Sequence, residues 1–138
     1  RAHPEACREA FEARWDVTIT PLDTCGLVIL EGAAYQAIYT CSDPLIQVLV
    51  ENYLQWIGQV DWIRGVDPER QSTVLFDTVA VYLAFAEDLL VMEDLPVRVT
   101  DEGYTVIDSQ AKVIRCATAW KDREAFERLL VERLTGAG

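Results

Sequence analysis

Short β-branched runs alternate with helix-like stretches along this chain, and this alternation limits the fold most strongly. Residues 4–14 begin with Pro4, carry acids early and have Ala and Phe on one side, which predicts a short surface helix. Residues 16–20 follow as a β-branched run that Pro21 stops, so we expect a strand there. Strands interspersed with helices indicate an α/β fold.

The middle of the chain has mostly helical spacing. We expect helix over residues 27–63, interrupted at Ser42-Asp43-Pro44, where Ser42 or Asp43 caps a second helix. Residues 64–72 are polar and predict a mobile loop, and residues 77–90 predict an apolar helix. The predicted buried side of the second helix is Val48, Leu49, Asn52, Tyr53 and Trp56, and the predicted stripe of the later helix is Val81, Phe85 and Leu89.

The last third of the chain adds more strands than a strictly alternating fold would have. Residues 96–100, 104–107 and 112–118 are β-rich and are joined by short polar turns, as in an antiparallel meander, so the sheet should be mixed. Asp122 or Arg123 then opens a final amphipathic helix that contains Phe126.

Composition excludes several classes of protein and partner. The chain has 138 residues with 51% hydrophobic side chains, which predicts one compact unit. Its net charge of −11 repels phosphate backbones, so we expect neither nucleic acid nor an anionic membrane as a partner. No apolar run approaches the roughly 18 residues of a membrane span.

The four cysteines are Cys7, Cys25, Cys41 and Cys116, and their wide spacing lacks a CxxC pair or an adjacent His for zinc. We expect reduced, structural thiols, which favours a cytoplasmic location. The absence of an initiating Met and of a leader predicts that further sequence precedes Arg1.

Three segments carry a resemblance to a known family. They are His3-Pro-Glu-Ala6 followed by residues 15–24, the run Ser72-Thr-Val-Leu-Phe-Asp-Thr-Val-Ala80, and residues 101–108. In order and separation they resemble the C-terminal part of inosine-uridine-type nucleoside hydrolases, over nearly the whole chain. The resemblance implies the C-terminal portion of an open, mostly parallel α/β sheet with flanking helices.

The same resemblance implies a chemistry. The family hydrolyses the N-glycosidic bond of ribonucleosides to ribose and free base, with calcium holding the sugar diol and a water molecule. Asp77 matches the calcium ligand that the C-terminal part contributes. The family's N-terminal Asp-x-Asp-x-x-x-Asp-Asp cluster, which supplies further ligands and the catalytic base, has no match here, so the chain should be inactive alone. From spacing alone, Asp77 could instead simply cap its helix.

Aromatic residues near Asp77 are the candidate base contacts. Phe76 stands where many family members have a His that protonates the departing base. Phe cannot donate a proton, so the resemblance implies that the leaving base is activated either by an aromatic ring stacked on it or by a donor elsewhere. Trp62, and less directly Trp56, lie on the stretch that contributes aromatic contacts in the family. The alternative for all three is a place in the core. His3 stands at the family's Asp before Pro-Glu-Ala, and we expect an exposed residue near a helix cap.

Two functions remain open at this point. The first is a fragment of a calcium-dependent nucleoside hydrolase whose partners are its ribonucleoside substrate and a missing N-terminal part of the same protein, in a homo-oligomer. The second is a non-catalytic interaction or scaffold remnant of that fold, because half of an open sheet exposes an edge and an apolar face.

Overall fold

The computed structural model describes residues 2–61 and 63–136. The chain divides by its internal contacts into two units, each assembled from separate segments. The first comprises residues 1–24 and 78–121, and the second comprises residues 25–77 and 122–138.

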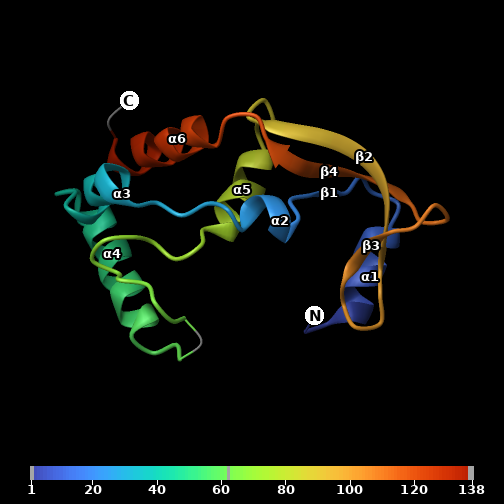
Figure 1. Ribbon diagram of the computed structural model, residues 1–138, viewed down its shortest axis with the longest axis horizontal. Coiled ribbons are helices and arrows are strands. Elements are labelled where there is room, and N and C mark those ends of the chain that lie inside the picture. The colour runs from blue at the N-terminus through green and yellow to red at the C-terminus, as the bar shows by residue number, and fades with distance from the viewer. Residues whose placement is uncertain (1, 62, 137–138) are drawn as a thin grey trace. The chain divides into compact units, whose positions relative to one another are not determined.

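The first unit contains a four-stranded sheet in the order β1-β4-β2-β3, formed by β1 (Thr18–Ile19), β2 (Leu90–Val99), β3 (Thr105–Ile107) and β4 (Val113–Trp120) (Figure 1). Strand β1 runs parallel to β4, while β2 is antiparallel to both β3 and β4. A mixed α/β architecture is therefore confirmed. The expectation of a mostly parallel sheet is wrong for the described residues, because only the β1–β4 pairing is parallel.

The predicted meander is also corrected, because β2 rather than β3 is the central strand. The tight turn after β2 places Gly103 at φ 78°, where glycine is favoured, and folds β3 back along one edge of β2. The Asp108 amide then donates to the Pro96 carbonyl, while the Val97 amide donates to the Lys112 carbonyl. Successive residues of a strand direct their backbone groups to opposite edges, so residues 108–112 carry the chain across to the other side of β2.

Helix α1 (Pro4–Glu12) packs against β2 in this unit. Its bounds are close to the predicted residues 4–14. Buried Val97, Ile114 and Cys116 form a core cluster, and partly buried side chains of Phe11 and Ile19 among others pack on it. The short helix α2 (Leu22–Cys25) follows β1, and the hydroxyl of buried Thr24 donates to the Ala117 carbonyl at 2.8 Å.

Helix α5 (Phe76–Leu83) is shorter than the predicted helix over residues 77–90. The Tyr82 hydroxyl donates to Asp88 at 2.6 Å and accepts from the Leu89 amide at 3.3 Å, which stabilises a turn in place of further helix. The predicted stripe is wrong as well, because Val81 and Phe85 are each 64% exposed. Val79 and Tyr82 are the buried residues of α5.

The second unit is helical, with α3 (Gly32–Tyr39), α4 (Pro44–Ile57) and α6 (Arg123–Thr135). The predicted break at residues 42–44 is confirmed, since the Asp43 carboxylate caps α4 by accepting from the Leu45 amide at 2.8 Å. Helix α6 begins as predicted, capped by Asp122. The expected helix over residues 27–31 is absent.

The predicted buried side of α4 is wrong for most of its residues. Ile46 is buried, and Val50 and Tyr53 pack on the same cluster, together with Leu30, Tyr35 and Ile38. The exposed apolar side chains of α4 are Leu45, Val48, Leu49 and Trp56. Only Tyr53 of the predicted set contacts the core, because two apolar stripes compete on this helix and the core selects the other one.

Two findings bear on the expectations from composition. No described helix is long and apolar enough to cross a membrane. The four cysteines are free thiols, as predicted, with Cys25 and Cys116 buried and Cys7 and Cys41 half-buried.

Candidate functional site

The segment that leads into α5, residues 71–75, is held against residues 28–31 of the same unit, and we call it the strap. The Ser72 amide donates to the Leu30 carbonyl at 2.8 Å, and the Ser72 hydroxyl accepts from the Leu30 amide at 2.9 Å. The Leu75 amide donates to the Val28 carbonyl at 2.9 Å. Because Val28, Leu30 and Ser72 are all buried, these bonds are shielded from water and fix the strap along its length.

Side chains of α3 and α4 hold the strap and the loop before it. The Tyr53 hydroxyl accepts from the Thr73 amide at 2.8 Å, and the Tyr35 hydroxyl donates to the Pro68 carbonyl at 2.6 Å. Burial, with smaller contributions from the nearby Tyr53, Tyr39 and Asp67, raises the pKa of Tyr35 to about 12, which keeps this donor protonated. Residues 64–72 form a loop, as predicted, and it is anchored at several points, including an isolated bridge between Gln71 and Glu31.

Phe76 and Asp77 form the first turn of α5 directly after the strap. Phe76 is 39% exposed, which is not the position of a core residue, and Asp77 is exposed beside it. Asp77 lies inside the first turn, where a carboxylate interacts favourably with the positive end of the helix dipole. The turn thus presents a flat apolar ring and an adjacent carboxylate to solvent.

The described residues do not make a calcium site by themselves. Calcium takes about six to eight oxygen ligands, and no group of three or more His, Cys, Asp or Glu side chains in residues 2–61 and 63–136 is arranged to hold a metal ion. Asp77 is a suitable donor in its chemistry and exposure, but it is a single donor. A shell around Asp77 would need further oxygens, from other side chains, backbone carbonyls or water.

The other residues singled out in the sequence do not lie beside Phe76 and Asp77 in the chain. Trp62 lies outside the described residues. Trp56 is 42% exposed, and its ring centroid is 6.2 Å from that of Tyr53. His3 is exposed at the N-cap of α1 without a side-chain cap hydrogen bond, as the sequence predicted for a cap-region residue. The Asp108 carboxylate accepts from the Gln110 amide at 3.0 Å in the turn after β3.

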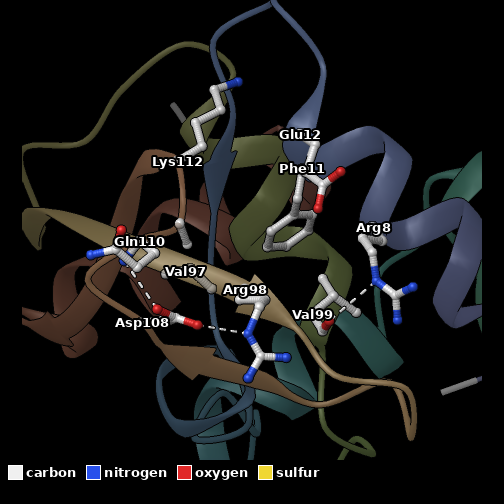
Figure 2. Close-up of a pocket in the computed structure, with 10 residues that line it drawn as sticks. Arg8, Phe11, Glu12, Val97, Arg98, Val99, Asp108, Gln110 and Lys112 are labelled. Carbon is white, nitrogen blue, oxygen red and sulfur yellow. Dashed lines mark hydrogen bonds and ion pairs between the residues drawn. The ribbon is translucent and has the colours of Figure 1, made fainter.

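A cavity in the first unit was not predicted from the sequence. It has a volume of about 250 Å³ and lies between α1 and the β2–β3 hairpin (Figure 2). Phe11, Val97, Val99 and Ala111 form its apolar wall, and its charged lining includes Arg8, Arg98, Asp108 and Lys112. These residues come from segments about ninety positions apart, so no local spacing in the sequence indicates that they meet.

The cations of this cavity are engaged in structural contacts. Arg98 pairs with Asp108 at 2.8 Å, which, after the Gln110 amide, lowers the pKa of that carboxyl. Arg8 pairs with Asp101 at 2.6 Å and donates to the Val99 carbonyl. The Lys112 ammonium donates to the carbonyls of Ala13 and Trp15, just past the end of α1. The charged side chains around this cavity therefore attach α1 to the sheet, and they are not directed together toward a ligand.

Comparisons with protein-family models and with curated proteins found no match to this chain. Within the described residues, the exposed pair Phe76 and Asp77 is the arrangement whose chemistry goes furthest toward a functional site.

Proposed function

We propose that this chain is the C-terminal part of a nucleoside hydrolase-like α/β protein that cleaves the N-glycosidic bond of ribonucleosides to ribose and free base. The observation that supports this most is the joint exposure of Phe76 and Asp77 at the start of α5. A Phe that serves only the core would be buried. An Asp that serves only as a cap would precede the helix and accept an amide, as Asp43 and Asp122 do for α4 and α6.

In this proposal Asp77 contributes one carboxylate to a calcium ion whose other ligands come from the preceding polypeptide, in a homo-oligomeric protein. Calcium, when bound, would hold the sugar diol and a water molecule. The base that takes a proton from that water would come from the family's N-terminal aspartate cluster, which has no match in this sequence, so we expect the chain to be inactive alone.

In this proposal the chain helps to bind the nucleobase. An exposed phenyl ring offers a flat apolar face on which a purine or pyrimidine can stack, a contact worth about 1 kcal/mol beyond the area that it buries. Phe76 carries no proton to donate, so assistance to the leaving base must come from a different group. Trp62 belongs to the same proposal as a second base contact.

The test uses the intact protein, meaning this chain with the preceding polypeptide that the proposal requires. Asp77→Asn removes the charge with little change of shape, and Asp23→Asn is the matched control, because Asp23 is also exposed in the first turn of a helix. Release of free base from inosine and uridine is measured at saturating calcium. We expect about a hundredfold loss, the size of effect seen when one charge-stabilising group is removed, for Asp77→Asn only; equal activity of the two variants would contradict the proposal.

A second candidate is a non-catalytic interaction domain, and one observation favours it. Helix α4 exposes four large apolar side chains, Leu45, Val48, Leu49 and Trp56, and Leu45 alone is 75% exposed. Exposed apolar side chains of this kind seek a partner surface. Base release together with light scattering distinguishes the candidates. An interaction domain would self-associate through these side chains and release no base from inosine or uridine, whereas a monomer at micromolar concentration would contradict it.

A further inference from the structure

Strand β3 lies at one edge of the four-stranded sheet, next to β2, and its three residues are all exposed (Figure 1). The Tyr104 carbonyl accepts from the Thr100 amide at 2.8 Å, and the Asp108 amide donates to the Pro96 carbonyl at 2.9 Å. Because backbone groups alternate in direction along a strand, Thr105 and Ile107 turn their N–H and C=O groups away from β2. The edge therefore presents two backbone donors and two backbone acceptors.

This edge lacks most of the features that keep edge strands from pairing. Such strands are commonly blocked by Lys, Pro, a bulge or a charge, whereas residues 104–107 read Tyr-Thr-Val-Ile and pair with β2 in regular register. Ile107 stands opposite buried Val97, so the two side chains share one face of the sheet. Ile107 is nevertheless 64% exposed. The apolar face that begins in the core thus continues to the edge and remains exposed there.

The edge is complementary to a copy of itself. A two-fold axis perpendicular to the sheet at Val106 places Thr105 opposite Ile107 of a second copy, and Ile107 opposite the Thr105 of that copy. Each of these two pairs consists of outward-facing residues and can exchange both N–H···O=C bonds. Opposite residues share a face, so the exposed side of Ile107 gains a neighbour from the second copy.

Charge favours a second copy over a basic peptide as the occupant. Asp101 and Asp108 flank the strand, but Asp101 pairs with Arg8 at 2.6 Å and Asp108 pairs with Arg98 at 2.8 Å. These engaged carboxylates offer a cationic peptide little to bind. The strand itself is uncharged, so two chains of net charge −11 can meet here without like charges directly opposite each other. Antiparallel pairing also sets the two hairpin tips, which carry Asp101 and Glu102, at opposite ends of the joined strands.

We propose that β3 is a self-association edge, at which two copies of this chain pair antiparallel about Val106 and join their sheets into one. The pairing uses neither Asp77 nor the exposed side chains of α4. It is therefore independent of the proposed hydrolysis and of any association through α4. Because β3 has only three residues, the contact is small, and the dimer dissociates on dilution.

Cysteine cross-linking of the intact protein tests the register. The two Val106 residues face each other without exchanging backbone bonds, so their Cα atoms lie about 4.5 Å apart, within the reach of a disulfide. Val106→Cys should therefore form a disulfide-linked dimer under mild oxidation. Val113→Cys is the matched control, because Val113 lies on β4 and is more exposed, at 57% against 36% for Val106. The four native thiols are common to both variants.

Sedimentation equilibrium of the intact protein over a dilution series tests whether the edge holds the dimer together. Ile107→Lys adds a charge of the kind that blocks edge strands, and we expect it to stay monomeric at concentrations where the unaltered protein is dimeric. Val113→Lys adds the same charge on β4 and should leave the dimer intact. Asp77→Asn should also leave it intact, whatever that substitution does to base release.

Four results would overturn the proposal. They are an unaltered protein that is monomeric throughout the series, a dimer that Ile107→Lys leaves intact, and a Val106→Cys variant that cross-links no faster than Val113→Cys. The fourth is slow hydrogen exchange of the Thr105 and Ile107 amides in the monomer, since another part of the same protein would then cover the edge. If Leu45→Lys dissociates the dimer and Ile107→Lys does not, association runs through α4 instead.

Discussion

Two neighbouring residues of α4 give a sharp test of how this helix faces its core. Ile46 is 5% exposed and Leu45 is 75% exposed, although both carry side chains of the same size. Ile46→Ala removes three buried carbons, worth about 2.4 kcal/mol at roughly 0.8 kcal/mol for each buried methylene. A residual cavity adds to this, so we expect a loss of about 3 kcal/mol in the free energy of unfolding. Leu45→Ala removes side-chain atoms that are three-quarters in water and should cost about 0.5 kcal/mol.

The assay is urea unfolding followed by circular dichroism at 222 nm, with the free energy in water extrapolated from the transition. The two variants carry the same kind of truncation on adjacent residues, so each controls for the other. A loss from Leu45→Ala equal to or larger than that from Ile46→Ala would mean that the stripe containing Leu45, Leu49 and Trp56 faces the core. That result would refute the packing of α4 in the second unit.

Two further predictions concern titration and thiol reactivity. The hydrogen bond from the Tyr82 hydroxyl is the main cause of the lowered pKa of the Asp88 carboxyl. The Tyr82–Asp88 hydrogen bond therefore stabilises the folded state at pH values above the ordinary carboxyl pKa, and this contribution is lost as the pH falls through the lowered pKa. In Tyr82→Phe, an NMR titration should show a higher Asp88 pKa, and an unchanged pKa would contradict the hydrogen bond. Burial raises the pKa of the Cys116 thiol, and the residue is 1% exposed. A maleimide should therefore label half-buried Cys41 well before Cys116. Equal labelling rates would contradict the packing of β4.

Local signals in the sequence predicted the elements of this fold better than their arrangement. Pro4, the Asp43-Pro44 pair and Asp122 mark helix starts through proline geometry and side-chain caps, and all three helices begin there. These signals act over a few residues, so a local pattern contains them. The strand order depends on residues 108–112 crossing β2, which rests on backbone bonds to Pro96 and Val97 that no local pattern indicates.

The prediction of which faces of α4 and α5 are buried was wrong for a related reason. Helix α4 carries apolar residues at two sets of helical spacings, and the cluster formed with α3, α6 and the strap decides that Ile46, Val50 and Tyr53 turn inward. In α5, the bond from Tyr82 to Asp88 favours a turn over helix continuation, although the residues after Leu83 remain apolar in pattern.

At the candidate site too, the sequence predicted the local motif but not the distant contacts that hold it. The motif around Phe76 and Asp77 could be found in the sequence, and the structure places both residues exposed in one helical turn. The anchors behind them could not be found, because Tyr53 and Val28 reach the strap across twenty and more than forty positions of chain. Contacts between segments so distant in sequence exist only once the second unit has folded.

The most direct measurement of the central claim is the carbonyl chemical shift of the Asp77 side chain during a calcium titration of the intact protein, recorded by carbon-detected NMR. Asp23, exposed in the first turn of α2, is the internal reference. We predict that the Asp77 carboxyl signal moves in step with calcium binding while the Asp23 signal stays fixed. A protein that binds calcium with the Asp77 signal unmoved would show that this carboxylate is not a ligand.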